Sequence, residues 1–145
     1  PHISERFFKA NESPFKIYGH DQTRAFCYID DAVNGTIGAM ESEKASDQIY
    51  HIGMDHEINM ETLTKYIGSL YKYSGEYKNA ITYPGSVSRR CPDINKARND
   101  FGYNPEISWE DAVRLTVEWY KEFFEQGNIP NKVSRTLESS IFIRP

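Results

Sequence analysis

The chain has 145 residues, a net charge of −4, 39% hydrophobic and 14% aromatic residues, so it can build the core of one domain and is not expected to be disordered. The acidic balance argues against nucleic-acid binding, and no apolar run approaches the roughly 20 residues of a membrane span. Neither Cys27 nor Cys91 lies in a CxxC pair or at metal-ligand spacing from a histidine. With no visible signal peptide, we expect a reduced, cytoplasmic protein without a metal site.

Residues 2–11 predict an amphipathic helix, and a short strand follows it. This strand is expected to bury one edge made of Phe15, Ile17 and the ring of Tyr18. Gly19 then supplies a positive φ for a turn, because glycine tolerates that conformation better than other residues. The sequence therefore predicts a strand and a sharp turn close to the N-terminus.

A second strand, expected over residues 25–29, leads into a helix over residues 31–41. Asp30 or Asp31 can cap this helix, since a carboxylate accepts the free N–H groups of the first turn. The inward face of the helix is expected to consist of small and apolar side chains: Ala32, Val33, Thr36, Ile37 and Met40.

The rest of the chain predicts further strands and three more helices. Residues 48–53, QIYHIG, are of alternating and β-branched character with a mainly apolar tone, which favours a strand inside a sheet. A weaker strand over 80–83 precedes a loop over 84–91. The helices are expected over residues 60–73, 94–101 and 109–125. Their expected caps are Asn59, Asp93 and Ser108, with Gly102 ending the middle helix. We expect one domain over residues 1–126 and an irregular tail over 127–145.

Arginines at two places in the chain are candidate ligands for an anion. Arg24 lies between the polar turn and the second expected strand, and a guanidinium offers phosphate a rigid fork of donors. Arg89 and Arg90 form an adjacent cation pair shortly before Pro92, where they could clamp an anion. We expect Arg24 and Arg90 to converge on one anion site. The alternatives are that Arg24 is solvated in a hairpin and that Arg90 pairs with a nearby carboxylate.

The segment around Arg24 also resembles a known family. Residues 17–31, IYGHDQTRAFCYIDD, are similar to the Tyr-Gly, Gln-Thr-Arg and Tyr-Val/Ile-x-Asp pattern of extended short-chain dehydrogenase/reductases that act on nucleotide sugars. These enzymes are epimerases, 4,6-dehydratases and UDP-glucuronate decarboxylases. The resemblance continues in three later segments: IYHIG at 49–53, SRRCPDINKAR at 88–98 and FGYNPEISWEDAVRLTVEWY at 101–120. The sequence departs from the pattern at Asp21, His51, Phe101 and Tyr103.

The resemblance implies an α/β fold, namely the C-terminal substrate-binding part of such an enzyme, mainly helices with short strands. It implies that Arg90 contacts the nucleotide diphosphate and that Lys16 and Tyr18 line the base pocket, although a strand tyrosine can equally belong to a core. The complete enzyme is expected to bind NAD(P) and a UDP-, GDP- or dTDP-linked sugar, and to form a homodimer.

The motifs for the cofactor and for proton transfer are missing from the sequence. The nearest match to a dinucleotide-binding glycine turn, Gly35 to Gly38, lies inside a predicted helix and lacks the third glycine. No lysine has a tyrosine four residues before it. We therefore expect the chain alone to bind no NAD(P), to be inactive, and to lack the N-terminal dinucleotide-binding half. The alternative is a non-catalytic module that binds a nucleotide or docks to a partner.

A missing half would leave apolar surface uncovered. The expected strand over residues 49–53 and the helix around Val33 and Ile37 would normally pack within or against a larger parallel sheet. We therefore expect an exposed strand edge and an exposed apolar helix stripe. The isolated chain should then be marginally stable, self-associate, or need the N-terminal half in trans.

Overall fold

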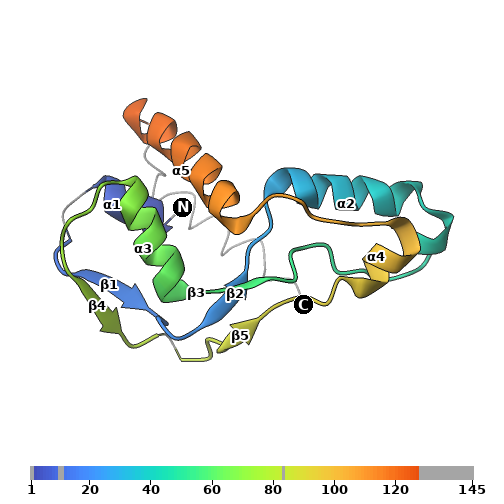
Figure 1. Ribbon diagram of the computed structural model, residues 1–145, viewed down its shortest axis with the longest axis horizontal. Coiled ribbons are helices and arrows are strands. Elements are labelled where there is room, and N and C mark those ends of the chain that lie inside the picture. The colour runs from blue at the N-terminus through green and yellow to red at the C-terminus, as the bar shows by residue number, and fades with distance from the viewer. Residues whose placement is uncertain (1, 10–11, 83, 128–145) are drawn as a thin grey trace, which may run out of the picture.

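The structure is a computed structural model that describes residues 2–9, 12–82 and 84–127. Figure 1 shows an elongated molecule with two parts, joined by small strands. The compact part comprises the described residues of 2–28, 56–90 and 108–127, and the arm comprises residues 29–55 and 91–107. The helices of the compact part are α1 (His2–Phe8), α3 (Met60–Leu70) and α5 (Trp109–Glu125). Those of the arm are α2 (Ile29–Glu41), α4 (Asn95–Phe101) and the short 3-10 helix η1 (Glu43–Ala45).

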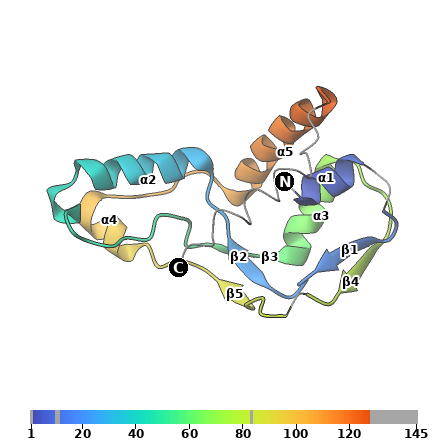
Figure 2. The same cartoon turned by 180° about the vertical axis from the view of Figure 1, so that it is seen from behind.

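The described strands form two small sheets. Strand β1 (Phe15–Tyr18) pairs in parallel with β4 (Tyr77–Ala80). Strand β2 (Thr23–Ala25) lies between β3 (Glu57–Asn59), which is antiparallel to it, and β5 (Arg89–Arg90), which is parallel. The segment that contains β1 and β2 therefore lies alongside the segment that contains β4 and β5. The two segments run in the same direction and pair at two places, β1 with β4 and β2 with β5. Figures 1 and 2 show the two pairs following one another along one edge of the molecule.

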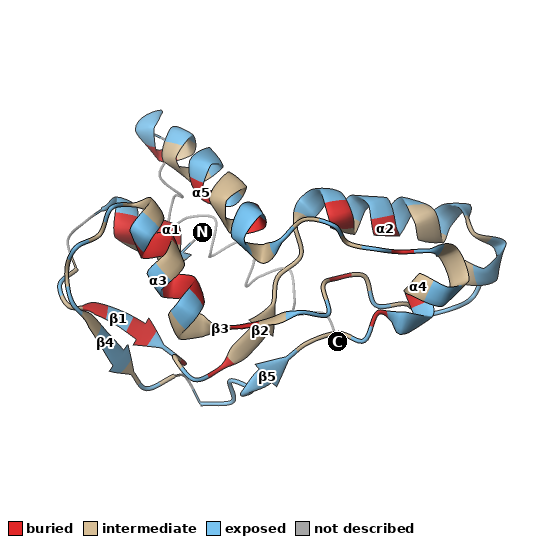
Figure 3. Cartoon of the chain, in the orientation of Figure 1, coloured by how far each residue is buried: buried red, intermediate tan, exposed pale blue. Residues whose placement is uncertain are grey.

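The core of the compact part lies between the sheet of β1 and β4 and the helices α1, α3 and α5. The rings of Phe7 and Phe15 stack with centroids 3.9 Å apart, and Phe15 is only 1% exposed. Burying such aromatic side chains removes a large apolar area from water. The remaining buried members of this cluster are Ile17, Ile58, Leu63, Ile67 and Val117. Figure 3 shows buried positions on β1 and β3 and on the helices α1, α3 and α5 of the compact part.

Three of the helix caps expected from the sequence, Asn59, Ser108 and Gly102, are confirmed. The expected cap Asp93 lies one residue before the N-cap of α4, which is Ile94. The side chain of Asn59 accepts hydrogen bonds from the backbone N–H groups of Glu61 and Thr62, at 2.8 and 3.4 Å. Ser108 accepts from the N–H of Asp111, and Asp93 accepts from the N–H of Asn95. Gly102 ends α4 in the left-handed region, with φ of 73°. The helix starts are thus correct to within one or two residues, because caps act locally.

The arm has a small core of its own, formed by Ile94, Ala97 and Tyr103. The Tyr103 hydroxyl donates a hydrogen bond of 2.9 Å to the carbonyl of Gly53. Helix α2 approaches this core closely, since a Cβ on Gly35 would lie 2.5 Å from the Tyr103 ring. Gly35 is therefore a packing glycine, and it lies inside α2 as the sequence predicted.

Helix α2 differs from the expectation in its cap and in its inward face. Neither Asp30 nor Asp31 caps it; instead the buried carboxylate of Asp31 accepts from the N–H groups of Glu106 and Ile107. The apolar side chains expected to point inward are exposed at Val33, Ile37 and Met40, and Thr36 is exposed too. The residues buried in this helix are Asp31 and Gly35. The sequence pattern was read correctly as amphipathic, but the apolar face has no cover within the described residues.

Several strand predictions were wrong in position. The second strand lies at 23–25 rather than 25–29, and the strand expected over 80–83 lies at 77–80, with residue 83 outside the described residues. Residues 48–53 form no strand, because no neighbouring strand pairs with them within the described part of the chain. The expected loop over 84–91 contains β5, which is defined only by its pairing with β2. Strand β3 was not predicted.

The ends of the chain are only partly described. Helix α1 ends at Phe8 instead of residue 11, and residues 10–11 lie outside the described residues. The expected irregular tail lies outside them from residue 128 onward.

Of the helices that the structure describes, none combines the length and apolar character needed to cross a membrane.

Candidate anion-binding site

The register of β2 and β5 brings the two candidate arginines side by side. Thr23 pairs with Arg89, and Arg24 pairs with Arg90, in a parallel ladder. Paired residues of neighbouring strands lie on the same face, on strands about 4.8 Å apart, and successive residues alternate between faces. Arg24 and Arg90 therefore share one face, and Arg89 points to the other.

Arg89 is neutralised on its own face by a carboxylate. Its guanidinium lies 2.9 Å from Glu57 of β3, whose carboxylate also accepts a hydrogen bond of 2.9 Å from the Thr23 hydroxyl. Hydrogen bonds from Arg89 and Thr23 hold the pKa of Glu57 below its ordinary value, and the same contact raises the pKa of Arg89. Through Glu57, Arg89 and Thr23, these contacts link all three strands of the sheet. Because its charge is neutralised by Glu57, Arg89 is a weaker candidate for binding an anion.

Arg24 is engaged by neutral oxygen atoms. One terminal nitrogen donates to the carbonyls of Thr23 and Ser88, at 2.6 and 3.3 Å. The other donates to the Val87 carbonyl at 2.7 Å, to the Gln22 side chain at 2.8 Å and to the Ser86 hydroxyl at 3.5 Å. No carboxylate neutralises Arg24 among the described residues. The positive charge of Arg24 is therefore not neutralised by these contacts, although both terminal nitrogens of its guanidinium already donate hydrogen bonds.

Arg90 is exposed, and no hydrogen bond or ion pair of its guanidinium is found within the part of the chain that the structure describes. Within the described residues, Arg90 therefore does not form the ion pair with a nearby carboxylate that was the alternative expectation. A guanidinium without partners can offer two parallel N–H groups to a phosphate. Of the arginines on this sheet, Arg90 is the one best placed to take a ligand.

Lys16 and Tyr18 lie on the exposed face of β1, opposite the buried Phe15 and Ile17. The expectation that the Tyr18 ring joins the buried edge was wrong, because alternation along a strand sends it outward. The Arg6 guanidinium lies 5.7 Å from the centre of the Tyr18 ring. The parallel register also sets Lys78 of β4 beside Lys16, which adds a second ammonium group that the sequence did not single out.

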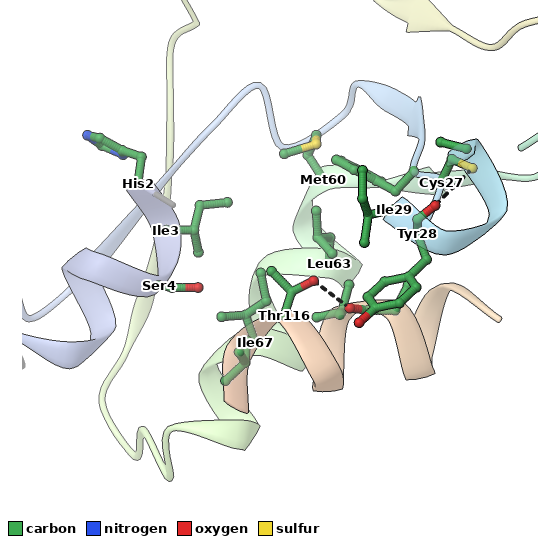
Figure 4. Close-up of a pocket in the computed structure, with 15 residues that line it drawn as sticks. His2, Ile3, Ser4, Cys27, Tyr28, Ile29, Met60, Leu63, Ile67 and Thr116 are labelled. Atoms are coloured by element: carbon green, nitrogen blue, oxygen red, sulfur yellow. Dashed lines mark hydrogen bonds between the residues drawn. The ribbon is translucent and has the colours of Figure 1, made fainter. Parts of the chain in front are cut away.

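A separate apolar cavity of about 540 Å³ lies between α1, α3, α5 and the segment leading into α2. Figure 4 shows side chains from all four elements around it, among them Ile3, Leu63 and Thr116. Its lining is almost wholly apolar, so it does not suit a nucleotide diphosphate. Ile29, which lines the cavity, begins an exposed apolar stripe along α2 that continues through Val33, Ile37 and Met40.

The sequence reasoning missed three residues of the arginine site. Gln22 and Ser86 contact Arg24, and Glu57 holds Arg89. Gln22 lies in the quoted Gln-Thr-Arg motif, which is the sequence signal that could have identified it, and the structure shows its side chain to be 8% exposed. Ser86 and Glu57 lie more than 30 residues from their arginine partners, so no local pattern could have identified them.

Comparison with known proteins assigns the fold. No family model matches the chain. A solved UDP-glucose 4-epimerase with UDP-glucose from Thermotoga maritima superposes with a TM-score of 0.74 at 25% identity, over 85% of this chain and 39% of that one. The fold is therefore the α/β fold of the C-terminal part of an extended short-chain dehydrogenase/reductase.

Curated relatives narrow the assignment. UDP-glucuronate 4-epimerase of Thermodesulfobacterium geofontis is 36% identical over 128 residues, which cover 83% of this chain and 38% of the relative. UDP-N-acetyl-alpha-D-glucosaminuronate decarboxylase of Bacillus cytotoxicus is 32% identical over 113 residues, covering 73% of this chain and 35% of the relative. The resemblance seen in the sequence is confirmed: the chain is homologous to the C-terminal part of nucleotide-sugar epimerases, dehydratases and decarboxylases. It spans about a third of the length of the curated relatives that it matches.

Proposed function

We propose that residues 1–126 form the substrate-binding part of an NAD(P)-dependent nucleotide-sugar epimerase, dehydratase or decarboxylase. The observation that supports this most directly is the parallel register that sets Arg24 beside Arg90 on one face of β2 and β5. Two cationic side chains on neighbouring strands match the two phosphate groups of a nucleoside diphosphate in the sign of their charge. The names of the relatives, which act on UDP- and dTDP-linked sugars, agree with this ligand class.

In this proposal Arg90 and Arg24 bind the diphosphate, and Lys16 and Tyr18 line the pocket of the base. An exposed aromatic ring such as that of Tyr18 can stack on a nucleobase, and Lys16 lies two residues away on the same face of β1. Binding energy from the nucleotide would orient the sugar for reaction elsewhere in the complete enzyme. UDP-, GDP- and dTDP-sugars all remain candidate substrates.

The hydride and proton transfers belong, in the proposal, to a dinucleotide-binding half that is not part of this sequence. Here Gly35 and Gly38 lie within α2, so their N–H groups are not presented to a pyrophosphate as a glycine turn would present them. The chain alone is expected to bind no NAD(P) and to have no activity. The complete enzyme is expected to be a homodimer.

Calorimetric titration of the chain with UDP, GDP and dTDP tests the proposal. At least one nucleotide should bind, and Arg90→Ala should weaken its binding by roughly tenfold or more, because a charge-assisted hydrogen bond contributes about 1.5–3 kcal/mol. The matched control is Arg114→Ala, which removes an equal charge from α5 and leaves β5 intact. Equal affinities for wild type and Arg90→Ala, or no binding of any nucleotide, would contradict the proposal.

A second candidate is a partner-docking module without nucleotide binding. The observations that favour it are the apolar cavity and the exposed stripe of Ile29, Val33, Ile37 and Met40. Large apolar patches often mark interaction surfaces. This candidate gains if no nucleotide binds while the chain associates through the stripe. Calorimetry with NAD should show no micromolar affinity under either candidate.

A further inference from the structure

Helix α5 carries a row of apolar side chains outside the core. Leu115, Trp119 and Phe123 recur at intervals of four residues, so they lie on one side of the helix and form what we call the α5 row. Trp119 is 56% exposed, and its ring stacks on that of Phe123 with centroids 5.0 Å apart. Within the described residues, none of the three belongs to the buried cluster of the compact part or packs against it. Figures 1 and 2 show the C-terminal end of α5 projecting beyond the other helices.

The segment that follows α5 in the sequence carries a matching row. Val133, Leu137 and Ile141, the tail row, also recur at intervals of four residues. Counted from Asn128, the members of the α5 row lie 5, 9 and 13 residues before it, and those of the tail row lie 5, 9 and 13 residues after it. If the chain reversed direction at Asn128 and continued as a second helix, the two rows would meet member by member.

The residues between the two rows favour such a reversal. Gly127 lies in the left-handed region with φ of 77°, and its N–H donates to the carbonyl of Phe124 at 3.0 Å. A glycine in this conformation commonly ends a helix and turns the chain away from its axis. Pro130 suits the first turn of a new helix, where no N–H is needed from it. Two antiparallel helices are typically joined by about 2–5 residues, which the sequence provides here.

The charges of the two segments are complementary. The tail over 128–145 carries three basic residues and one acidic residue, so its net charge is +2. The whole chain has a net charge of −4, which leaves −6 for residues 1–127. On α5 itself, the acidic side chains of Glu118, Glu122 and Glu125 are exposed near the α5 row. Charge of opposite sign favours the tail over a second copy of the acidic part as the cover for this surface.

We propose that residues 130–143 fold back along α5 as a second helix, with the tail row covering the α5 row. An apolar row of three side chains cannot stabilise so short a helix in water, so the segment is ordered only by its contact with α5. This agrees with the irregular tail that its sequence alone predicts. The contact hides an exposed tryptophan that otherwise invites association. The α5 row lies on another element than the arginines of β2 and β5, and the proposal does not depend on the proposed function.

Acrylamide quenching of tryptophan fluorescence in the full chain tests the proposal. The signal of Trp119 is the difference between a chain and its Trp119→Phe variant, which keeps Trp109. Leu137→Glu places a charge in the tail row and should raise the quenching of Trp119 at least about twofold, because the segment would no longer shield the ring. Ser139→Glu is the matched control, since it adds the same charge to the tail outside the row and should change nothing.

NMR supplies a second readout. The methyl signals of Leu137 should be shifted upfield by the Trp119 ring, and Trp119→Leu should remove that shift while keeping an apolar side chain in the α5 row. Both readouts should be independent of protein concentration, since the contact lies within one chain. Protection of Trp119 that appears only as the concentration rises would overturn the proposal and make a second copy the cover. Equal quenching in the wild type, Leu137→Glu and Ser139→Glu, or unshifted Leu137 signals in the wild type, would also overturn it.

Discussion

The compact part and the arm bury their apolar side chains to very different extents. In the compact part, β1, α1, α3 and α5 surround a cluster whose Phe15 is 1% exposed. In the arm, α2 carries an apolar stripe that ends in Met40 at 80% exposure, and the neighbouring Ile49 is 85% exposed. The compact part thus has a closed aromatic and aliphatic cluster, although Ile81 and Trp119 are exposed on its surface, whereas the apolar stripe of α2 in the arm has no cover among the described residues.

The difference indicates which part needs further protein to fold against. Residues 48–53 have the composition of a buried strand but no strand to pair with in the described residues. The apolar side of α2 likewise lies uncovered there. Parallel strands are normally covered on both faces. The arm therefore resembles one edge strand of such a sheet together with the helix that would pack on the sheet. The exposure expected from the sequence is confirmed for the helix stripe, and the strand itself is not formed.

The largest expected effect comes from the core of the compact part. Phe15→Ala should lower the free energy of unfolding by about 3–5 kcal/mol, because it removes a buried ring stacked on Phe7 and leaves a cavity. Ile37→Ala in the arm is the matched test and should cost less than about 0.5 kcal/mol, since Ile37 is already exposed. Urea titration of both variants measures the difference. Equal losses would show that the two parts do not differ as described.

The next effect concerns the contact that ties α2 to the segment before α5. Asp31→Ala should cost about 1–3 kcal/mol, because it leaves the N–H groups of Glu106 and Ile107 without their shared acceptor. Asp30→Ala is the control, since Asp30 is exposed on the same helix turn. Thermal unfolding of the two variants gives the comparison. A loss for Asp30→Ala as large as that for Asp31→Ala would refute the role of the Asp31 carboxylate.

A smaller effect on stability, but a clear one on association, is expected from the stripe. Ile37→Lys should weaken self-association of the chain by about tenfold, because it places a charge in the apolar surface that another chain would cover. Asn34→Lys adds the same charge to an exposed polar position of α2 and should change little. Size-exclusion chromatography over a range of concentrations measures the association. A wild-type chain that stays monomeric and melts sharply would contradict the expectation and strengthen the case for a free-standing module.

The smallest effect is the pH dependence of the pair between Glu57 and Arg89. The pKa of Glu57 is lowered by hydrogen bonds from Arg89 and Thr23, so the pair stabilises the fold above the ordinary value of 4.5. That contribution should be lost as the pH falls through the lower pKa of the folded state. Melting temperatures of wild type and Glu57→Gln should therefore differ near neutral pH and converge in acid. A difference that persists at about pH 3 would exclude the ionised pair as its cause.

The sequence was informative wherever the deciding contacts are local. Asn59, Ser108 and Gly102 act within one turn of the helix that they begin or end, so their roles followed from short patterns. The resemblance of residues 17–31 to nucleotide-sugar enzymes was likewise carried by adjacent residues, and the comparisons confirm it. The binding roles of Lys16, Tyr18, Arg24 and Arg90 stay predictions.

Taken by itself, the sequence determined which segments form helices, the caps Asn59, Ser108 and Gly102, and the family to which the chain is homologous. Only the tertiary structure decided which strands pair, because β5 exists through its register with β2 rather than through its two residues. The tertiary structure also decided that Arg89, but not Arg90, forms an ion pair with Glu57. In the same way it decided that the Asp31 carboxylate accepts hydrogen bonds from residues 106–107 instead of capping α2. These outcomes depend on groups 30 to 80 residues apart in the chain, and a local pattern of side chains holds no information about which distant polar group will become its partner.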